Sequence, residues 1–234
     1  SVTEIGDYAF CGCSGLTSIT IPESVTKIGD EAFEACSGLT SITIPERVTE
    51  IGYNAFYGCS ITSVKFNAIN CGAINNGTIV IDYDGKKFID VSAGWSNLTL
   101  LTIGDKVKKI PDFAFCECTG LTSITIPESV TKIGNFAFLH CSGLTSVTIP
   151  ESVTKIGYDA FFGCSGLTSI TIPEGVTEIE SGTFKGCSGL TSIAIPVGVA
   201  EIGDYACCGC SGLTSVTIPE SVTKIEESAL EDCS

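Results

Sequence analysis

The chain has 234 residues, with 12 Lys and Arg against 27 Asp and Glu, and its formal net charge at pH 7 is −15. A surface of this charge repels phosphate backbones and anionic lipids, so the composition argues against nucleic acid as a partner. No uninterrupted apolar stretch approaches the ~18 residues of a membrane-spanning helix, so we expect no direct membrane insertion of this chain.

A 23-residue repeat organises the sequence. Cys recurs every 23 residues from Cys13 to Cys59 and again from Cys118 to Cys233. The interval between the two series is 59 residues, so one of the predicted units is irregular and longer than the others. Repeats of this length indicate stacked units. We expect one solenoid domain over 1–234, a fragment of a longer array, with a β-hairpin in the irregular unit 59–94.

The first half of each unit predicts a short strand. In the first complete unit, Ile19 and Ile21 are expected to point inward and Thr20 outward, because side chains alternate along a strand. Pro22 follows and ends the strand, since proline has no N–H to donate to a neighbour.

The second half of each unit predicts a shorter strand and a turn. Val25 and Ile28 give a second inward-facing pair. Asp30 is placed to cap a single helical or 3₁₀ turn, and this turn would bury Ala32 and Phe33.

A single unit has too few apolar side chains to offset the entropy lost when it becomes ordered, so each unit must pack between neighbours. Equivalent strands would then lie about 4.8 Å apart. The pattern predicts an α/β solenoid, mostly β, with one parallel sheet, short second strands and helical or 3₁₀ turns.

The segment "LTSITIPESVTKIGDEAF" resembles the 23-residue BspA-like class of leucine-rich repeats, whose units share L-x-x-I-x-I-P, V-x-x-I-G, A-F and a following Cys. The resemblance covers nearly the whole chain. It implies a curved, right-handed solenoid in an extracellular or cell-surface protein that adheres to host, neighbouring-cell or extracellular-matrix proteins. It implies neither enzymatic activity nor a cofactor.

The 14 Cys residues could form disulfides, a metal site or part of the core. Nine of them share one repeat position, which predicts an interior column where free Cys packs as a small apolar residue. Parallel, in-register side chains rarely reach the torsion of about 90° that a disulfide requires, so we expect no continuous disulfide column.

The other five Cys are expected to differ. Cys11, Cys116 and Cys208 share a position that holds Glu, Tyr, Leu, Phe or Lys in other units, which predicts a surface position. Cys207 replaces a Phe and is expected in the core, and Cys71 belongs to the irregular unit. The Cys-x-Cys pairs lack further converging ligands, so we expect no metal site.

The outward strand position carries Thr in most units and is the first candidate binding surface. Thr125, Thr148 and Thr171 represent it. This hydroxyl face lacks the Trp, Tyr and Arg that anchor tight interfaces, so it is either a broad, weak protein-binding surface or a solvated sheet face. A row of acidic residues from Glu23 to Glu220 predicts a ridge that is either a solvated edge or a contact for calcium or a basic protein.

The irregular unit contains the second candidate site. Its segment "TIVIDYDGKKFIDV" predicts a hairpin around an Asp84-Gly85 type I′ turn. Loops on rigid scaffolds often bind ligands, so the candidates here are Tyr83, Asp84, Lys86, Lys87 and, after the hairpin, Trp95. Trp95 stands where a column Cys is expected, so it either anchors a ligand or fills the core.

The sequence favours a protein without catalytic residues. The only His, His140, lies at a predicted turn beside a buried Cys, with no third group to orient a nucleophile. Two hypotheses follow: a protein-recognition or adhesion module, and a passive spacer in a larger surface protein.

Overall fold

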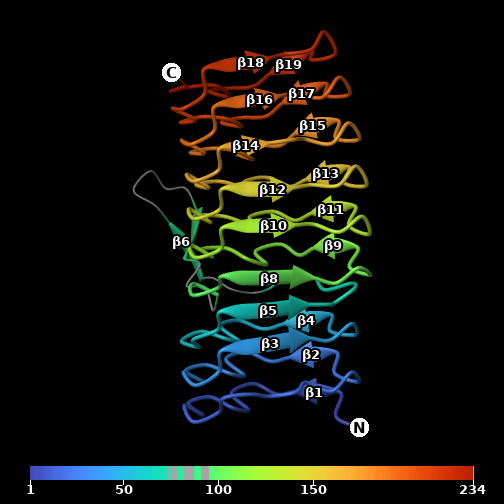
Figure 1. Ribbon diagram of the computed structural model, residues 1–234, viewed down its shortest axis with the longest axis vertical. Coiled ribbons are helices and arrows are strands. Elements are labelled where there is room, and N and C mark those ends of the chain that lie inside the picture. Colours follow the sequence, from blue (N-terminus) through green and yellow to red (C-terminus); the bar gives the residue numbers. More distant parts are fainter. Residues whose placement is uncertain (73, 75–77, 82–86, 91–94, 234) are drawn as a thin grey trace.

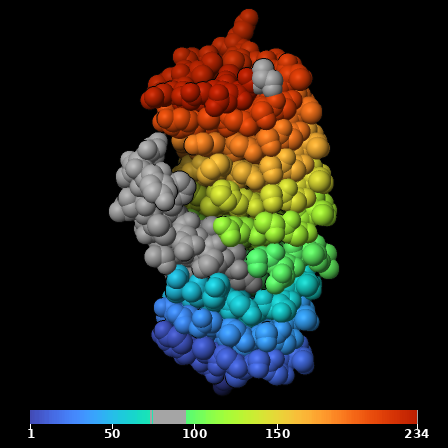
Figure 2. Space-filling view, turned by 90° about the vertical axis from the view of Figure 1, so that its left-hand side faces the viewer, coloured from blue at the N-terminus to red at the C-terminus, as the bar shows by residue number. Residues whose placement is uncertain are grey.

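The computed structural model describes residues 1–72, 74, 78–81, 87–90 and 95–233. These residues form a stack of coils with the chain ends at opposite ends of the long axis (Figure 1). Successive coils appear as bands from blue to red in the space-filling view (Figure 2). The parallel solenoid predicted from the repeat is confirmed, because equivalent residues of successive regular units pair directly, as Ser123 does with Ser146.

The first row of strands contains the L-x-x-I-x-I segments. It comprises β3 (Ser41–Ile44), β5 (Ser63–Phe66), β8 (Leu100–Ile103), β10 (Ser123–Thr125), β12 (Ser146–Thr148), β14 (Ser169–Ile170), β16 (Ser192–Ala194) and β18 (Ser215–Thr217). Burial alternates along these strands as predicted: in β3, Ile42 and Ile44 are buried, whereas Ser41 and Thr43 are exposed.

The second row consists of two-residue strands, and the last residue of each is Ile. It comprises β1 (Glu4–Ile5), β2 (Lys27–Ile28), β4 (Glu50–Ile51), β9 (Lys109–Ile110), β11 (Lys132–Ile133), β13 (Lys155–Ile156), β15 (Glu178–Ile179), β17 (Glu201–Ile202) and β19 (Lys224–Ile225). An isolated bridge between Ile51 and Ile74 carries this row into the irregular unit.

The irregular unit changes the register of the first row. β3 and β5 pair Ser41 with Ser63, and β5 and β8 pair Ser63 with Leu100, so neither step has the regular spacing of 23 residues. The additional chain contains β6 (Thr78–Ile81) and β7 (Lys87–Asp90), which form the predicted antiparallel hairpin. Figure 1 places β6 beside the turns of the stack, away from the first row.

The third side of each coil is a series of turns, and the expected helical or 3₁₀ turns were wrong for the described residues. The N–H groups of Tyr8, Phe10 and Gly12 donate to the carbonyls of the next coil at 2.7–2.8 Å. The intervening N–H groups bond within their own coil. Left-handed φ angles, 58° at Tyr8 and 74° at Gly12, produce this alternation and prevent a continuous helical run.

The Asp at the start of this turn also differs from the expected helix cap. The N–H of Asp30 donates to Asp7 Oδ1 of the preceding coil at 2.9 Å, and Asp30 Oδ1 accepts the N–H of Tyr53 at 2.7 Å. The carboxylate therefore joins two coils rather than capping its own turn.

The core consists of ladders of identical side chains. Phe10, Phe33 and Phe56 stack with ring centroids 5.0 and 5.3 Å apart. The series from Phe115 to Phe184 continues it at 5.4–5.9 Å in the later coils. The column Cys fills the space beside the rings, as predicted, and is buried from Cys36 to Cys210.

We expect Phe138→Ala to lower the free energy of unfolding by ~3–5 kcal/mol, because the fully buried ring stacks on both neighbouring Phe rings and its loss leaves a cavity. Phe10→Ala is the matched control, since Phe10 is only partly buried and stacks on one described ring. Urea denaturation followed by far-UV circular dichroism measures both. Equal losses in the two variants would contradict the role of two-sided stacking.

Candidate binding surface and the family

The exposed face of the first strand row is the larger candidate surface. Thr125 of β10 lies beside Thr148 of β12 in register, and Thr171 follows in the next coil. All three side chains are exposed, as expected from the alternation. The structure thus brings these predicted site residues together in one column, while ligand binding by them stays a prediction.

Two residues interrupt the uniform Thr and Ser composition of this face. Leu100 occupies the column that holds Ser in the other units, and its side chain is 58% exposed. Lys65 of β5 occupies the Thr column, pairs with Thr102 and makes no ion pair with any described residue. Sequence reasoning selected neither Lys65 nor Leu100. The signal was available in the aligned repeats, where each residue breaks its column.

The hairpin candidates lie apart from this face. Tyr83, Asp84 and Lys86 fall outside the described residues, as does the predicted Asp84-Gly85 turn. Lys87 begins β7 and pairs with Ile81. Since β6 lies on the turn side in Figure 1, the structure does not combine the hairpin and the Thr column into one site.

Trp95 fills the core. Its side chain is 1% exposed and stacks on Phe56 with ring centroids 4.8 Å apart. Its carbonyl accepts the N–H of Leu98, as the carbonyl of Cys118 accepts that of Leu121. The backbone of Trp95 therefore has the position of a column Cys, while its ring packs against the Phe ladder. Filling the core was one of the two expected roles, and Trp95 is not available as a surface anchor. Its indole Nε1 has no hydrogen-bond partner among the described residues.

These coils match a known repeat family. A family model described as "BspA type Leucine rich repeat region" matches in six copies over residues 3–79 and 108–234. The chain belongs to this family. The resemblance noted in the sequence is thereby confirmed. The unmatched segment, 80–107, contains most of the hairpin and the strand with Leu100.

Solved bacterial structures share the fold of this BspA-type chain. A leucine-rich repeat protein from Bacteroides ovatus is 30% identical with a TM-score of 0.58, and the match covers 100% of this chain and 68% of that one. A leucine-rich cell surface protein from Faecalibacterium prausnitzii is 32% identical with a TM-score of 0.57, covering 100% and 61%. The T. pallidum leucine-rich repeat protein is 27% identical with a TM-score of 0.55, covering 75% and 78%. A comparison with curated proteins gave no match.

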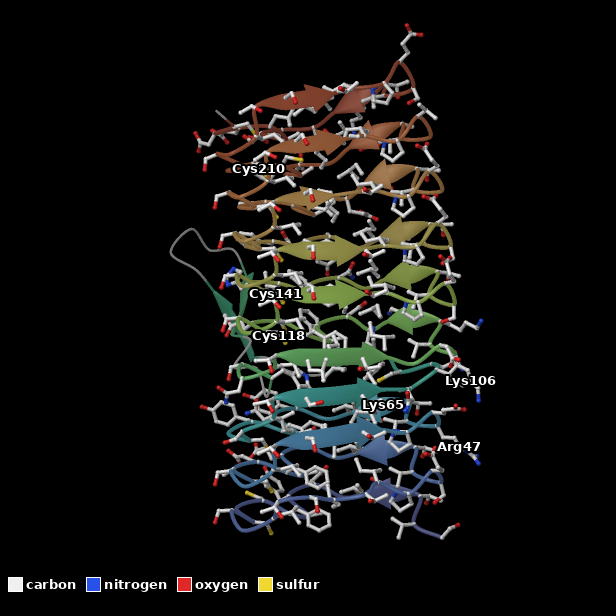
Figure 3. The ribbon with its side chains drawn as sticks, viewed as in Figure 1. Arg47, Lys65, Lys106, Cys118, Cys141 and Cys210 are labelled. Carbon is white, nitrogen blue, oxygen red and sulfur yellow. The ribbon has the colours of Figure 1, made fainter. Side chains whose placement is uncertain are left out.

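The column thiols of this BspA-type chain are packing groups. Sγ of Cys141 donates to the carbonyl of Phe115 in the preceding coil at 3.1 Å. With the exception of Cys118, the other buried members from Cys36 to Cys210 donate in the same way to the carbonyl of the equivalent Phe at 3.1–3.2 Å. Burial raises the pKa of Cys59 to about 12. A thiol held in its neutral form is a poor nucleophile, and Figure 3 shows Cys118, Cys141 and Cys210 within the stack.

One surface prediction for Cys was wrong. Cys11 is exposed as expected and Cys208 is half-buried, but Cys116 is fully buried. Cys116 and Leu139 form a small second cluster against Phe113, Phe136 and Phe162 on the turn side. These aromatic rings cover a position that remains open in the first coils, so burial there depends on which neighbours each coil supplies. Cys207 is in the core as expected, and Cys71 is buried.

The remaining polar groups of interest are His140 and the side chains of metal-ligating type. His140 is exposed on a turn with a φ of 55° and contacts the edge of Phe162. No group of three or more His, Cys, Asp or Glu residues is placed to hold a metal ion within the described ranges. The same residues include no helix long and apolar enough to cross a membrane.

The acidic ridge is locally neutralised. Lys106 Nζ lies 2.8 Å from Glu46 Oε1, and Val197, 73% exposed, interrupts the acidic column between Glu174 and Glu220. Figure 3 shows Arg47 and Lys106 projecting from this edge of the stack. The ridge is thus mixed in charge and polarity, and binding of a cation or a basic protein to it stays a prediction.

We expect thiol titration of the native protein to separate the Cys residues by exposure. Cys11 and Cys13, which are exposed, should react quickly, whereas the buried column should react only in denaturant. The double variant Cys11→Ser, Cys13→Ser should lose the fast phase. Persistence of an equally large fast phase in that variant would show that the column is accessible.

We expect Asp159→Asn to change the pH dependence of stability. Burial raises the pKa of the Asp159 carboxyl to about 6, with Lys185 acting in the opposite direction. Because the folded-state pKa lies above the unfolded value of about 3.9, this group stabilises the fold below pH ~4, and that contribution is lost as the pH rises through about 6.

Asn is a suitable substitute because Asn54 already occupies the same repeat position in another coil. Its backbone there has a similar left-handed φ of 50°, against 52° at Asp159. Relative to the parent, Asp159→Asn should gain stability between pH 4 and pH 7, as measured by urea midpoints. A stability difference that does not vary over this range would contradict the assignment.

Proposed function

We propose that this BspA-type chain is a non-catalytic protein-binding module of a cell-surface or secreted protein. Its partners would be host, neighbouring-cell or extracellular-matrix proteins, and its contact surface would be the exposed face of the first strand row. The observation that carries the proposal is the ordered column of exposed side chains, exemplified by Thr125 and Thr148, on a rigid hydrogen-bonded scaffold.

The solenoid form supports a binding role because stacked repeats create extended surfaces that no single unit could present. Family membership and the similarity to a structure named as a cell surface protein support the location. No group of three or more His, Cys, Asp or Glu residues converges within the described residues, which favours recognition over metal-dependent chemistry.

A passive spacer is the second candidate. The uniform Thr and Ser composition of most of the face favours it, because tight interfaces usually contain Trp, Tyr or Arg anchors. The two functions differ in whether the folded chain binds any protein through the sheet face.

A binding panel of extracellular-matrix and cell-surface proteins tests the proposal. The variant Thr148→Arg places a long charged side chain on the sheet face, and Thr177→Arg makes the same change at an exposed position outside the first row. We expect Thr148→Arg to weaken binding by about tenfold or more and Thr177→Arg to leave it unchanged.

A further variant with Tyr83, Lys86 and Lys87 changed to Ala tests the hairpin separately. Loss of binding in that variant alone would move the contact surface to the hairpin. If the folded parent bound no protein of the panel at about micromolar concentration, the spacer function would be favoured.

A further inference from the structure

Within the first strand row, which begins at β3, the ladder is interrupted between β8 and β10. The first coil stands apart, because its residues 16–21 form no strand and make no backbone hydrogen bond to β3. β8 bonds to β5 and β10 bonds to β12, but among the described residues no backbone hydrogen bond joins β8 to β10. The axial bond from Thr145 N–H to the carbonyl of Thr122 is present, as is that from Thr99 to Thr62, whereas the equivalent bond from Thr122 to Thr99 is not formed.

The opening is confined to the sheet face. On the second row, β9 and β11 pair Lys109 with Lys132 at the same level, so the stack is continuous there. We call the gap between β8 and β10 the seam. Backbone groups on its two sides have no bond across it, and such groups usually require a partner from protein or water.

A groove of about 410 Å³ follows the seam. Its walls are Leu100–Ile103 on one side and Ser123–Thr125 with Pro127 on the other. Leu100 lines this groove and is 58% exposed. All the other units have Ser at this repeat position. The fold therefore does not require an apolar residue there.

The charge next to the groove is also distinctive. Lys65 lies on the neighbouring strand beside Thr102, a groove residue, and has no ion pair in the described parts of the chain. Lys106, at the edge of the same strand row, is already paired with Glu46. The chain has a net charge of −15, so most of its surface repels carboxylates. Beside the groove, Lys65 supplies a cation with which a carboxylate can pair.

We propose that the seam is the specificity-determining part of the sheet face and that it binds an extended polypeptide segment carrying an apolar side chain next to a carboxylate. The apolar side chain packs on Leu100, and the carboxylate pairs with Lys65. The inference rests on the proposed protein-binding function and specifies the chemistry of the partner.

Fluorescence polarisation with short synthetic peptides tests the inference on the full chain. The probe contains one Leu flanked by Glu, and three matched peptides replace Glu by Gln, Glu by Lys, or Leu by Ser. We expect the Leu and Glu peptide to bind most tightly, with affinity falling as salt is added.

The variants Lys65→Thr and Leu100→Ser restore the residue that most other coils have at each position, so the fold is expected to be retained and is checked by circular dichroism and melting temperature. Lys65→Thr should weaken binding by about two- to fivefold, and Leu100→Ser by about tenfold. Lys132→Thr and Val197→Ser remove a cation and an exposed apolar side chain elsewhere and should have no effect.

Equal binding of the Glu and Lys peptides, an unchanged affinity in both seam variants, or binding of none of the peptides would overturn the inference. So would dimerisation of the parent that Leu100→Ser abolishes, because the seam would then be occupied by a second copy. A protein from the panel that binds the parent and both seam variants equally would overturn the seam while leaving the protein-binding function in place.

Discussion

Hydrogen bonds that run along the solenoid axis are the constraint on which this structure depends. Most coils bond to their neighbours through the strand rows and through N–H groups of the turn side, such as those of Tyr8 and Phe10. These bonds form only when adjacent coils present the same groups at the same level. Inward side chains are therefore stacked on copies of themselves, and the core becomes a set of ladders.

The same constraint explains why Cys recurs so regularly. The carbonyl of Phe33 accepts the N–H of Cys36 in its own coil and the Sγ–H of Cys59 in the next. A thiol is small and apolar enough for the core and still supplies a weak donor to that carbonyl. An alkyl side chain would fill the space without the bond, and a more polar side chain would cost more to bury.

Because the ladders make the coils alike, the differences between coils carry the functional information. The irregular unit replaces the 23-residue step by two others, and the first row opens one coil later, between β8 and β10. Lys65 and Leu100, which interrupt the face, flank this region. The regular coils hold the site in place, while the departures from regularity give it a shape and a charge of its own.

The repeat period, the alternation of burial and the packing role of the column Cys were determined by the sequence, because each follows from the spacing of identical residues in neighbouring coils. The second-row Ile follows in the same way, whereas the spacing left two roles open for Trp95 and the structure decided for the core. The sequence did not determine the conformation of the turns, where Asp30 joins coils instead of capping a helix, because left-handed φ angles are stabilised by bonds to the next coil.

Burial of Cys116 and the opening between β8 and β10 were likewise decided by the tertiary structure alone. The cluster of Cys116 and Leu139 is covered by rings from three different coils, Phe113, Phe136 and Phe162, so the repeat position of Cys116 gave no indication of its surroundings. The seam depends on whether two particular strands come close enough to bond, which the repeat pattern does not specify. Local patterns predict what one coil does, whereas contacts between unlike coils are fixed only when the whole stack is assembled.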